Sequence, residues 1–558
     1  MTIGTTSASG AHDTRPPLAR RGADLERLAN EPWDILVIGG GIVGAGALLD
    51  AASRGLRVAL VEQEDIAAGT SSRSSRLIHG GLRYLQQGEV GLVREALAER
   101  ARLLRLAPHL VRLEAFLFPI YGRRVVARAF YQAGLTGYDV LGSARSAGRH
   151  RHLDIRQTLE YAPNLVRKDL RGALLYHDAM EDDARFALAV VRTAQARWPG
   201  TVLAVTRVRA TAPLLDGQRV TGARVEDRLS GAAFDVRATT VLDATGVWGA
   251  MPDRPFGAGS FQVLPARGAH LIIPRGRIPA RGGMTLRIPG RVAFLVPWPR
   301  HWVIGTTDRP HRGPVDRIAA TGEDVDEILG TLNGALDLDL TRADVVGTYA
   351  GLRPLIAPSD ARSTVRISRE HKVSVAAPGL VRVSGGKYTT YRVMARDAID
   401  AALGPAAAGA CPSQTRNLPI HGAASRSDLD ALAARLATGK HALGDEAAMS
   451  LVDRHGTDAE AVLAVGAAHD LNRRLVDDAP YLEAEIAWAV DREMALSLDD
   501  LLARRLRLVH TLPDRGQAVA SRVAAIAGQV LGWGAERQAA EVGRFLDGAR
   551  RELGVPPG

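Results

Sequence analysis

The chain has 558 residues, 46% of them hydrophobic and 24% charged, which is the composition of an ordinary globular protein of two or three domains. Its single cysteine, Cys411, excludes an intramolecular disulfide framework and fits a reducing compartment, and no Cys or His spacing typical of a metal site occurs. No uncharged apolar run reaches the roughly 18 residues of a spanning helix, and the N-terminus lacks the apolar core of a signal peptide, so we expect a protein that is neither secreted nor transmembrane.

The net charge of +10 favours anionic partners. Nucleic acid, anionic lipid and phosphorylated substrates all fit, because a basic charge alone does not choose between them. The first residues, 1–31, are rich in Thr, Ser, Gly, Arg and Pro, and only 25–28 indicates a helical turn. This segment is expected to be a flexible tail.

A βαβ pattern follows at 34–62. An apolar, β-branched run at 35–38 predicts a strand buried on both faces, 45–53 is rich in helix formers, and 57–61 predicts a second strand.

Three glycines between the first strand and the helix fit the spacing G-x-G-x-x-G. Gly39 permits a tight turn, Gly41 lets a pyrophosphate approach the backbone, and Gly44 lets the helix pack closely on the strand. Glu62 ends the second strand, where a carboxylate accepts hydrogen bonds from a ribose diol. The pattern predicts a dinucleotide site, and FAD and NAD both remain open at this point.

Residues 69–85 combine small hydroxyl residues and glycines with charged side chains. Such a loop can lie along a cofactor's phosphates or ring edge, with His79, Arg83 and Tyr84 pointing into an adjoining site. Ser and Gly content alone favours a solvated loop, but the apolar residues at 77, 78 and 82 indicate a buried segment.

The spacing of leucines predicts a helix over 89–107, ended by Pro108. From 122 to 152 the chain is basic and interleaved with aromatics, a pattern that fits either a membrane-facing surface or an ordinary solvated helix pair. The residues that would contact lipid are Arg123, Arg124, Arg128, Phe130, Tyr131, Leu135 and Tyr138. The alternative attachment surface is a basic group farther along the chain, Arg504, Arg505 and Arg507.

The next part of the chain is predicted to be rich in strands. Their consecutive order, with few helices between them, predicts a second, mainly antiparallel sheet inserted into the nucleotide domain. The expected strands are 174–176, 202–208, 219–225, 241–244, 270–273, 292–296 and 302–305. Two segments, 242–246 and 383–391, end in glycine turns and are expected to return to the cofactor. After a Pro/Ala/Gly-rich joint at 404–413, capping-box spacings predict a separate helical domain over 415–555.

Several motifs together resemble one family, the FAD-dependent, quinone-linked aerobic glycerol-3-phosphate dehydrogenases. The motifs are VIGGGIVGAG, TSSRSSRLIHGGLRYL, DDAR at 182–185, ATGVW at 244–248, RGAHLIIP at 267–274, GTTD at 305–308, GLRPL at 351–355 and SGGKYTTYR at 384–392. The chain departs from the family pattern at Arg76, where Lys is usual, and at Tyr388, where Leu is usual.

The resemblance implies an α/β fold: a Rossmann-like FAD-binding domain of the DAO type over 32–410, an inserted antiparallel substrate sheet, and a C-terminal all-α domain. The FAD-binding parts would be 32–110, 165–250 and 345–405. The implied FAD ligands are Gly39, Gly41, Gly44, Glu62, Thr70, Ser71, Ser72, His79, Gly80, Gly81, Gly246, Gly386, Lys387 and Thr389.

The implied reaction is oxidation of sn-glycerol 3-phosphate to dihydroxyacetone phosphate, with electrons passed to a membrane quinone. His270 would be the base or orient the hydroxyl, because imidazole exchanges protons near neutral pH. Arg83, Arg353 and Lys387 would clamp the phosphate and polarise the nascent ketone, with Tyr84 and Asp308 as weaker candidates. The expected location is the cytoplasm, at the inner face of the membrane on an anionic lipid surface. No nucleic-acid partner is expected, and a homo-oligomer remains possible.

Three other functions remain open from the residues alone. A glycerol-3-phosphate oxidase would pass electrons to oxygen from the same site. A nicotinamide-dependent dehydrogenase could use the same glycine turn, and a non-enzymatic phosphate- or membrane-binding protein could use the same basic groups.

Overall fold

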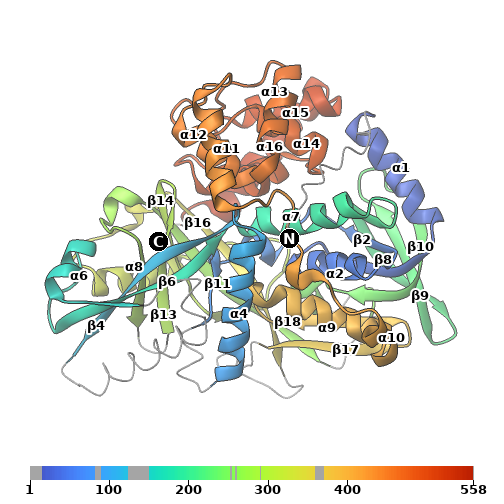
Figure 1. The fold of residues 1–558 in the computed structure, drawn as a ribbon, viewed down its shortest axis with the longest axis horizontal. Coiled ribbons are helices and arrows are strands. Elements are labelled where there is room, and N and C mark those ends of the chain that lie inside the picture. Colours follow the sequence, from blue (N-terminus) through green and yellow to red (C-terminus); the bar gives the residue numbers. More distant parts are fainter. Residues whose placement is uncertain are drawn as a thin grey trace.

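The structure, a computed structural model, describes residues 15–81, 89–122, 150–251, 254–257, 261–288, 291–357 and 370–556. Figure 1 shows three parts: a parallel sheet with helices packed on it, a second sheet beside it, and a group of C-terminal helices above both. The predicted site residues Arg83 and Tyr84, and the basic aromatic residues of 123–149, lie outside the described residues.

The first sheet has the strand order β17-β18-β10-β1-β2-β7, and all pairs from β18 to β7 are parallel. Antiparallel strands β17, β8 and β9 extend it. The strand bounds are β1 (Trp33–Ile38), β2 (Val58–Glu62), β7 (Val202–Thr206), β8 (Val208–Asp216), β9 (Arg219–Asp227), β10 (Ala233–Asp243), β17 (His371–Ala377) and β18 (Leu380–Gly385). The βαβ unit predicted at 34–62 is therefore confirmed as β1, α2 and β2.

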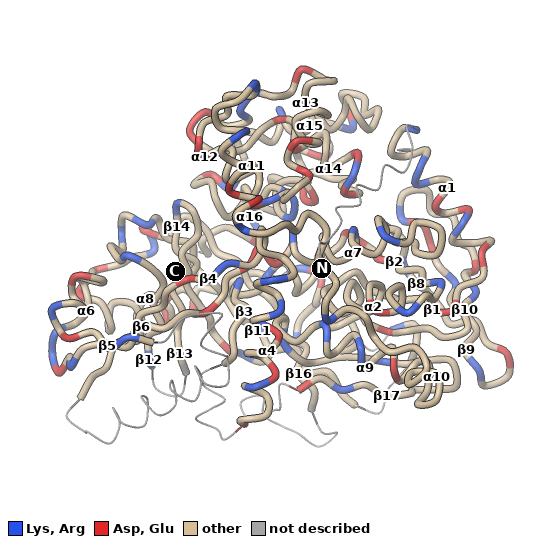
Figure 2. The backbone as a smooth tube through the Cα atoms, viewed as in Figure 1, with Lys and Arg blue, Asp and Glu red and all other residues tan. Residues whose placement is uncertain are grey.

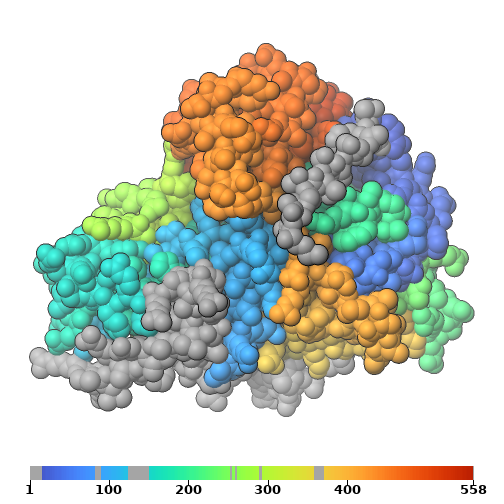
Figure 3. All heavy atoms as spheres, viewed as in Figure 1, coloured from blue at the N-terminus to red at the C-terminus, as the bar shows by residue number. Residues whose placement is uncertain are grey.

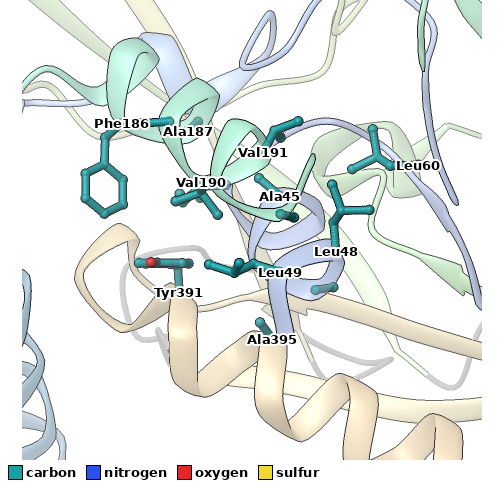
Figure 4. Close-up of a cluster of buried hydrophobic side chains, with 14 of the residues drawn as sticks. Ala45, Leu48, Leu49, Leu60, Phe186, Ala187, Val190, Val191, Tyr391 and Ala395 are labelled. Atoms are coloured by element: carbon teal, nitrogen blue, oxygen red, sulfur yellow. The ribbon is translucent and has the colours of Figure 1, made fainter. Parts of the chain in front are cut away.

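Three helices enclose the apolar core on this sheet. They are α2 (Ile42–Ser53), α7 (Asp183–Arg197) and α9 (Tyr391–Leu403). Figure 4 shows their side chains meeting: Leu49 of α2 lies between Val190 of α7 and Tyr391 of α9, and Leu48 lies towards Leu60 of β2. Gly46 allows this close approach, because a Cβ there would lie 2.8 Å from the Tyr391 ring.

The second sheet contains the strand order β15-β11-β14-β13-β12-β4-β6-β3, with β16 paired to β11 and β5 to β6. All its pairs are antiparallel except β12 with β4, which confirms the prediction of a mainly antiparallel insertion. Its strands are β3 (Leu77–Ile78), β4 (Val111–Tyr121), β5 (Arg151–Leu153), β6 (Leu170–Glu181), β11 (Gln262–Pro274), β12 (Gly283–Ile288), β13 (Arg291–Trp298), β14 (His301–Gly305), β15 (Arg309–Pro310) and β16 (Gly347–Ala357). The accompanying helices are α4 (Val90–Leu106), α6 (Ile155–Tyr161) and α8 (Gly322–Ala335).

The C-terminal helices form what we call the helical lobe, residues 415–556. Figure 3 shows it, orange to red, seated over the rest of the molecule. Two apolar clusters of its own fill it. After the short connecting helix α10 (Pro405–Ala410), its helices are α11 (Arg426–Thr438), α12 (Asp445–His455), α13 (Ala459–Ala468), α14 (Ala484–Arg492), α15 (Ala520–Leu531) and α16 (Ala535–Leu553), with a π-helical segment η8 (Asp500–Arg505) and a 3₁₀ turn η9 (Leu508–His510).

The prediction of a flexible tail over 1–31 is wrong for its second half. Residues 17–30 form helix α1 (Pro17–Asn30), which buries Leu28 completely against the first sheet. Arg21 pairs with Asp227 at 2.7 Å, and Arg20 pairs with Asp491 of the helical lobe. The Thr- and Ser-rich composition of the first residues obscured the spacing of Leu25 and Leu28, which places both on one helical face.

In the part of the chain that the structure describes, no helix is both long enough and apolar enough to cross a membrane. Figure 2 shows basic and acidic residues interspersed in every part, including the helical lobe. The alternative basic attachment surface is also wrong. Arg504 and Arg505 both pair with Asp65, at 2.6 and 2.7 Å, and Arg507 pairs with Asp183 at 2.7 Å. Arg505 and Arg507 are buried and Arg504 is only partly exposed, so the three do not form an exposed basic surface.

Candidate active site

A cavity of about 910 Å³ is lined by residues of both sheets. On one side it is bounded by the end of β1, the end of β2 and the 3₁₀ turn η1 (Thr70–Ser72). On the other it is bounded by β11, β16 and the turn before η5 (Tyr388–Thr390). Its volume lies in the range typical of sites for cofactors and substrates.

The first side, which we call the cofactor wall, comprises Gly39, Gly41, Glu62, Thr70 and Ser71. Gly39 has φ +109°, which side chains rarely adopt, and a Cβ there would lie 2.7 Å from the carbonyl oxygen of Ala244. The backbone of this turn therefore faces the cavity without side chains in between. The N–H groups in the first turn of α2 and the positive end of its dipole suit the binding of a pyrophosphate.

Gly44 acts behind the cofactor wall rather than on it. A Cβ at this position would lie 1.9 Å from the carbonyl oxygen of Gly39, so only glycine lets α2 pack this closely on the turn. This matches the packing role that the motif predicts for its third glycine.

Glu62 closes the cofactor wall at the end of β2. Its carboxylate accepts hydrogen bonds from the backbone N–H groups of Gly40, at 2.6 Å, and Glu64, at 2.8 Å. Burial raises the pKa of Glu62 to about 6, so the side chain is ionised at pH 7. An ionised carboxylate fixed at the end of the second strand is placed to accept hydrogen bonds from a ribose.

The loop 69–75 is anchored to helix α2 on one side and to β16 of the second sheet on the other. The Ser71 hydroxyl accepts a hydrogen bond from the Ile42 N–H at 2.9 Å, and the Thr70 hydroxyl donates to the Leu352 carbonyl at 2.6 Å. On the far side the His79 N–H donates to the Thr389 hydroxyl at 3.2 Å. The loop is therefore shaped and partly buried, as its apolar residues predicted.

The second side, which we call the substrate wall, comprises His270, Arg353 and Lys387. The Nε2 of His270 lies 2.8 Å from the Ser75 hydroxyl, and its ring stacks on Tyr349 with centroids 4.5 Å apart. Burial, and then the positive charges of Arg353 and Arg76, lower the pKa of His270 to about 3. The imidazole is therefore neutral at pH 7 and can accept a proton or a hydrogen bond.

Arg353 extends from β16 towards the same cavity. Its guanidinium donates to the Thr306 hydroxyl at 3.0 Å and lies 3.3 Å from the Asp308 carboxylate. Gly268 leaves room for it, because a Cβ there would lie 2.5 Å from Nη2 of Arg353. Lys387, on the turn that follows β18, supplies a second cation to the wall. Two cations within one cavity can bind a phosphate dianion, Arg bidentately and Lys as a point charge.

The cavity collects many, but not all, of the predicted residues. Those that line it are Gly39, Gly41, Glu62, Thr70, Ser71, His79, Gly246, His270, Arg353, Gly386, Lys387 and Thr389. Gly44, Ser72, Gly80 and Gly81 do not line it. Among the described residues no cluster of three His, Cys, Asp or Glu side chains is arranged to hold a metal ion.

Comparison with known proteins agrees with this geometry. Residues 34–401 match the family model of the FAD-dependent oxidoreductases, and residues 413–538 match the C-terminal domain of alpha-glycerophosphate oxidase. The chain is 44% identical to glycerol-3-phosphate dehydrogenase 2 of Mycobacterium bovis, over 96% of this chain and 91% of that protein.

The chain belongs to the glycerol-3-phosphate dehydrogenase family of FAD-dependent oxidoreductases.

Other members of the family are also similar over most of their length. The mitochondrial glycerol-3-phosphate dehydrogenase of Mus musculus is 35% identical over 95% of this chain and 74% of that protein. Among solved structures, the glycerol-3-phosphate dehydrogenase of Bacillus halodurans complexed with FAD superposes with a TM-score of 0.78 at 26% identity, covering 96% of this chain and 98% of that one.

FAD is therefore the cofactor, and the cofactor wall fits it. The glycine turn exposes backbone where a pyrophosphate would lie, and Glu62 is fixed and ionised where a ribose would lie. A nicotinamide-dependent dehydrogenase, which the glycine turn alone left open, is set aside by the family assignment.

Sequence reasoning missed several residues that support the substrate wall. Ser75 contacts His270, Tyr349 stacks on it, and Thr306 holds Arg353. Each lies inside or beside a recognised motif. Their position in or beside these motifs was the signal that the sequence offered. Only the fold shows which of these side chains contact one another.

Proposed function

We propose that the protein oxidises sn-glycerol 3-phosphate to dihydroxyacetone phosphate and passes the electrons to a membrane quinone. The observation that carries the proposal is the convergence of His270, Arg353 and Lys387 on one cavity that also contains the glycine turn. Oxidation of a secondary alcohol needs a proton acceptor for the hydroxyl and a hydride acceptor beside the carbon, and a phosphorylated substrate needs cations.

In this proposal Arg353 and Lys387 bind the phosphate and so fix C2 of the substrate next to the cofactor wall. His270, neutral at pH 7, accepts or orients the C2 hydroxyl proton. FAD, when bound, accepts the hydride that leaves C2. The proton and the hydride together account for the two electrons and two hydrogens lost when the alcohol becomes a ketone. Arg83 and Tyr84 remain predicted members of the site.

The test is anaerobic addition of sn-glycerol 3-phosphate to the purified holoenzyme while the flavin spectrum is recorded. We expect bleaching by glycerol 3-phosphate at concentrations where glycerol, which lacks the phosphate, has no effect. Equal bleaching by both alcohols, or by neither, would remove the proposed substrate. Substrate-dependent bleaching would also rule out a non-enzymatic phosphate- or membrane-binding role.

A second candidate function is a glycerol-3-phosphate oxidase, which the match of residues 413–538 to an oxidase C-terminal domain favours. Both functions share the reductive half-reaction, so the acceptor separates them. Stoichiometric hydrogen peroxide in an aerobic, quinone-free assay would support the oxidase, whereas slow peroxide formation and rapid reduction of an added quinone support the dehydrogenase.

For the quinone to receive electrons, the protein must reach a bilayer, and we propose peripheral attachment at the inner face of the cell membrane. The support is the net charge of +10 and the basic, aromatic composition of 122–152. Near an anionic leaflet each cation contributes about 1 kcal/mol. Flotation with anionic vesicles at low and high salt, comparing wild type with a variant carrying Glu at 123, 124 and 128, tests it. If both float equally, this segment is not the membrane contact.

A further inference from the structure

A buried arginine links the helical lobe to the active-site loop. Arg507, which follows η8, is 1% exposed and has a left-handed backbone, φ +60°, that turns the chain between η8 and η9. Its guanidinium donates to the carboxylate of Asp183 at 2.7 Å and to the Ser72 carbonyl at 3.3 Å. Asp183 begins α7, and Ser72 belongs to the 69–75 loop, so one side chain joins three parts of the fold.

Asp183 passes this contact on to the cavity. It is fully buried, and its second carboxylate oxygen accepts hydrogen bonds from both the N–H and the hydroxyl of Ser74, at 2.9 and 2.7 Å. Ser74 and Ser75 both line the cavity. The Ser75 hydroxyl lies 2.8 Å from Nε2 of His270. A continuous chain of contacts therefore runs from Arg507 through Asp183 and the loop to the imidazole.

The stacked partner of His270 is tied to the same point. The Tyr349 hydroxyl donates to the Ser74 carbonyl at 2.8 Å, and the Tyr349 ring stacks on His270. Ser74 therefore helps to fix both groups that contact His270: the hydroxyl of its neighbour Ser75 at the edge of the imidazole, and the Tyr349 ring against its face.

The lobe also holds the loop from a second direction, because Arg73 pairs with Glu552 of α16 at 2.7 Å. Buried ion pairs elsewhere in the joint, as we call the interface between the helical lobe and the rest of the molecule, do not contact residues 72–75. Arg185 of α7, for example, pairs with Glu493 of the lobe at 2.7 Å, and both side chains are buried. Some of these pairs therefore only attach the lobe, whereas the Arg507–Asp183 and Arg73–Glu552 pairs also contact the loop beside the site.

We infer that Arg507 is a positioning residue of the active site: held against Asp183, it fixes the 72–75 loop so that Ser75 orients His270. The helical lobe is then a structural part of the catalytic centre and contributes to the rate of the flavin's reduction. This inference rests on the proposed role of His270 in oxidising glycerol 3-phosphate.

The test uses the full-length holoenzyme and compares Arg507→Met with Arg185→Met as the matched control. Both variants remove one buried guanidinium from the joint, but only Arg507 contacts the loop. The measurements are FAD content, thermal midpoint and the rate of anaerobic flavin reduction as glycerol 3-phosphate is raised to saturation, which separates the limiting rate from the substrate dissociation constant. We expect Arg507→Met with bound FAD to be reduced about ten- to a hundredfold more slowly at saturation, because a misplaced catalytic group lowers the limiting rate. The dissociation constant should hardly change, and Arg185→Met should melt earlier yet be reduced at the wild-type rate.

Two further variants distinguish positioning from a loosened joint. Arg507→Lys keeps the cation opposite Asp183 and should recover part of the rate; it also carries the test if Arg507→Met does not fold. Ser75→Ala should slow reduction by itself and add little in the Arg507→Met background, since both changes act on one contact.

Equal slowing of Arg507→Met and Arg185→Met, or additive effects of Ser75→Ala and Arg507→Met, would overturn the inference. A failure of the proposed function looks different, because wild type itself would then not be bleached by glycerol 3-phosphate.

Discussion

The cofactor wall of the cavity is made largely of backbone, whereas the substrate wall is made of charged and aromatic side chains. Gly39 and Gly41 contribute by lacking a Cβ, and their neighbours in sequence supply the helix and strand around them. His270, Arg353 and Lys387 come from three separate segments, and His270 and Arg353 depend on partners from elsewhere in the chain. A backbone site fails when a side chain is added, and a side-chain site fails by degrees when a charge or a hydrogen bond is removed.

The largest expected effect is therefore on the cofactor wall. Gly41→Val places a branched side chain where the pyrophosphate must approach, and its Cβ would already lie 3.3 Å from the Ser71 hydroxyl. We expect FAD binding to weaken by about 3 kcal/mol, roughly a hundredfold, while the chain stays folded. Flavin absorbance per chain and circular dichroism measure the two outcomes.

Gly330→Val is the matched control, because Gly330 is an exposed position of α8 with open space around its Cβ position. It should retain full flavin. A folded Gly41→Val protein with full flavin would show that the cofactor wall tolerates side chains. It would contradict the claim that this wall, unlike the substrate wall, depends on exposed backbone.

The next effect tests whether the substrate wall recognises phosphate. Arg353→Ala and Lys387→Ala each remove a charge-assisted contact worth about 1.5–3 kcal/mol, or about ten- to a hundredfold in kcat/KM for glycerol 3-phosphate. The turnover of glycerol, however slow, should change far less. Arg309→Ala, which removes a partly exposed cation that does not line the cavity, is the control. A proportional loss on both alcohols would mean that these residues do not bind phosphate.

The sequence predicts more of the cofactor wall than of the substrate wall, because the first is built from contiguous residues and the second from distant segments. The βαβ unit and its glycines are contiguous, so local periodicity and turn chemistry were sufficient to predict the cofactor wall. Arg353 and Lys387 were identified only through motifs. The contacts of Asp183 with Ser74 and Arg507 depend on how three distant segments pack, which no local pattern encodes. The sequence offers Arg507 only as part of an alternative membrane surface, because a cluster of arginines in sequence does not show that each one pairs with a buried carboxylate.

Two buried histidines, one on the substrate wall and one elsewhere, should give the same pH dependence of stability but differ in their effect on flavin reduction. Burial lowers the pKa of His270 to about 3 and that of His109 also to about 3, from an ordinary value of 6.5. Below pH 6.5 the unfolded chain binds protons that the folded chain does not, so stability is lost as the pH falls from 6.5 towards 3. By pH 5 each histidine should cost about 2 kcal/mol of unfolding free energy.

Denaturant unfolding between pH 7.5 and pH 5 measures this loss. His109→Gln should reduce it by about 2 kcal/mol and leave flavin reduction by glycerol 3-phosphate unchanged, because His109 does not line the cavity. His270→Gln should reduce the loss equally and also slow flavin reduction. If neither variant reduced the loss of unfolding free energy between pH 7.5 and pH 5, these imidazoles would not be buried in the neutral form.

The smallest effect concerns a hydroxyl that ties two parts of the cofactor wall together. Ser71 accepts the hydrogen bond of the Ile42 N–H at the first turn of α2, as an N-terminal cap would, although it comes from the 69–75 loop. Ser71→Ala should lower the unfolding free energy by about 1 kcal/mol and weaken FAD binding only slightly, because the glycine turn keeps its shape. Denaturant unfolding and flavin titration measure the two quantities. Thr438→Ala, which removes an exposed hydroxyl that donates to a carbonyl of its own helix, should change neither. A loss of flavin from Ser71→Ala as large as that from Gly41→Val would show that the cofactor wall depends on its side chains as much as the substrate wall does.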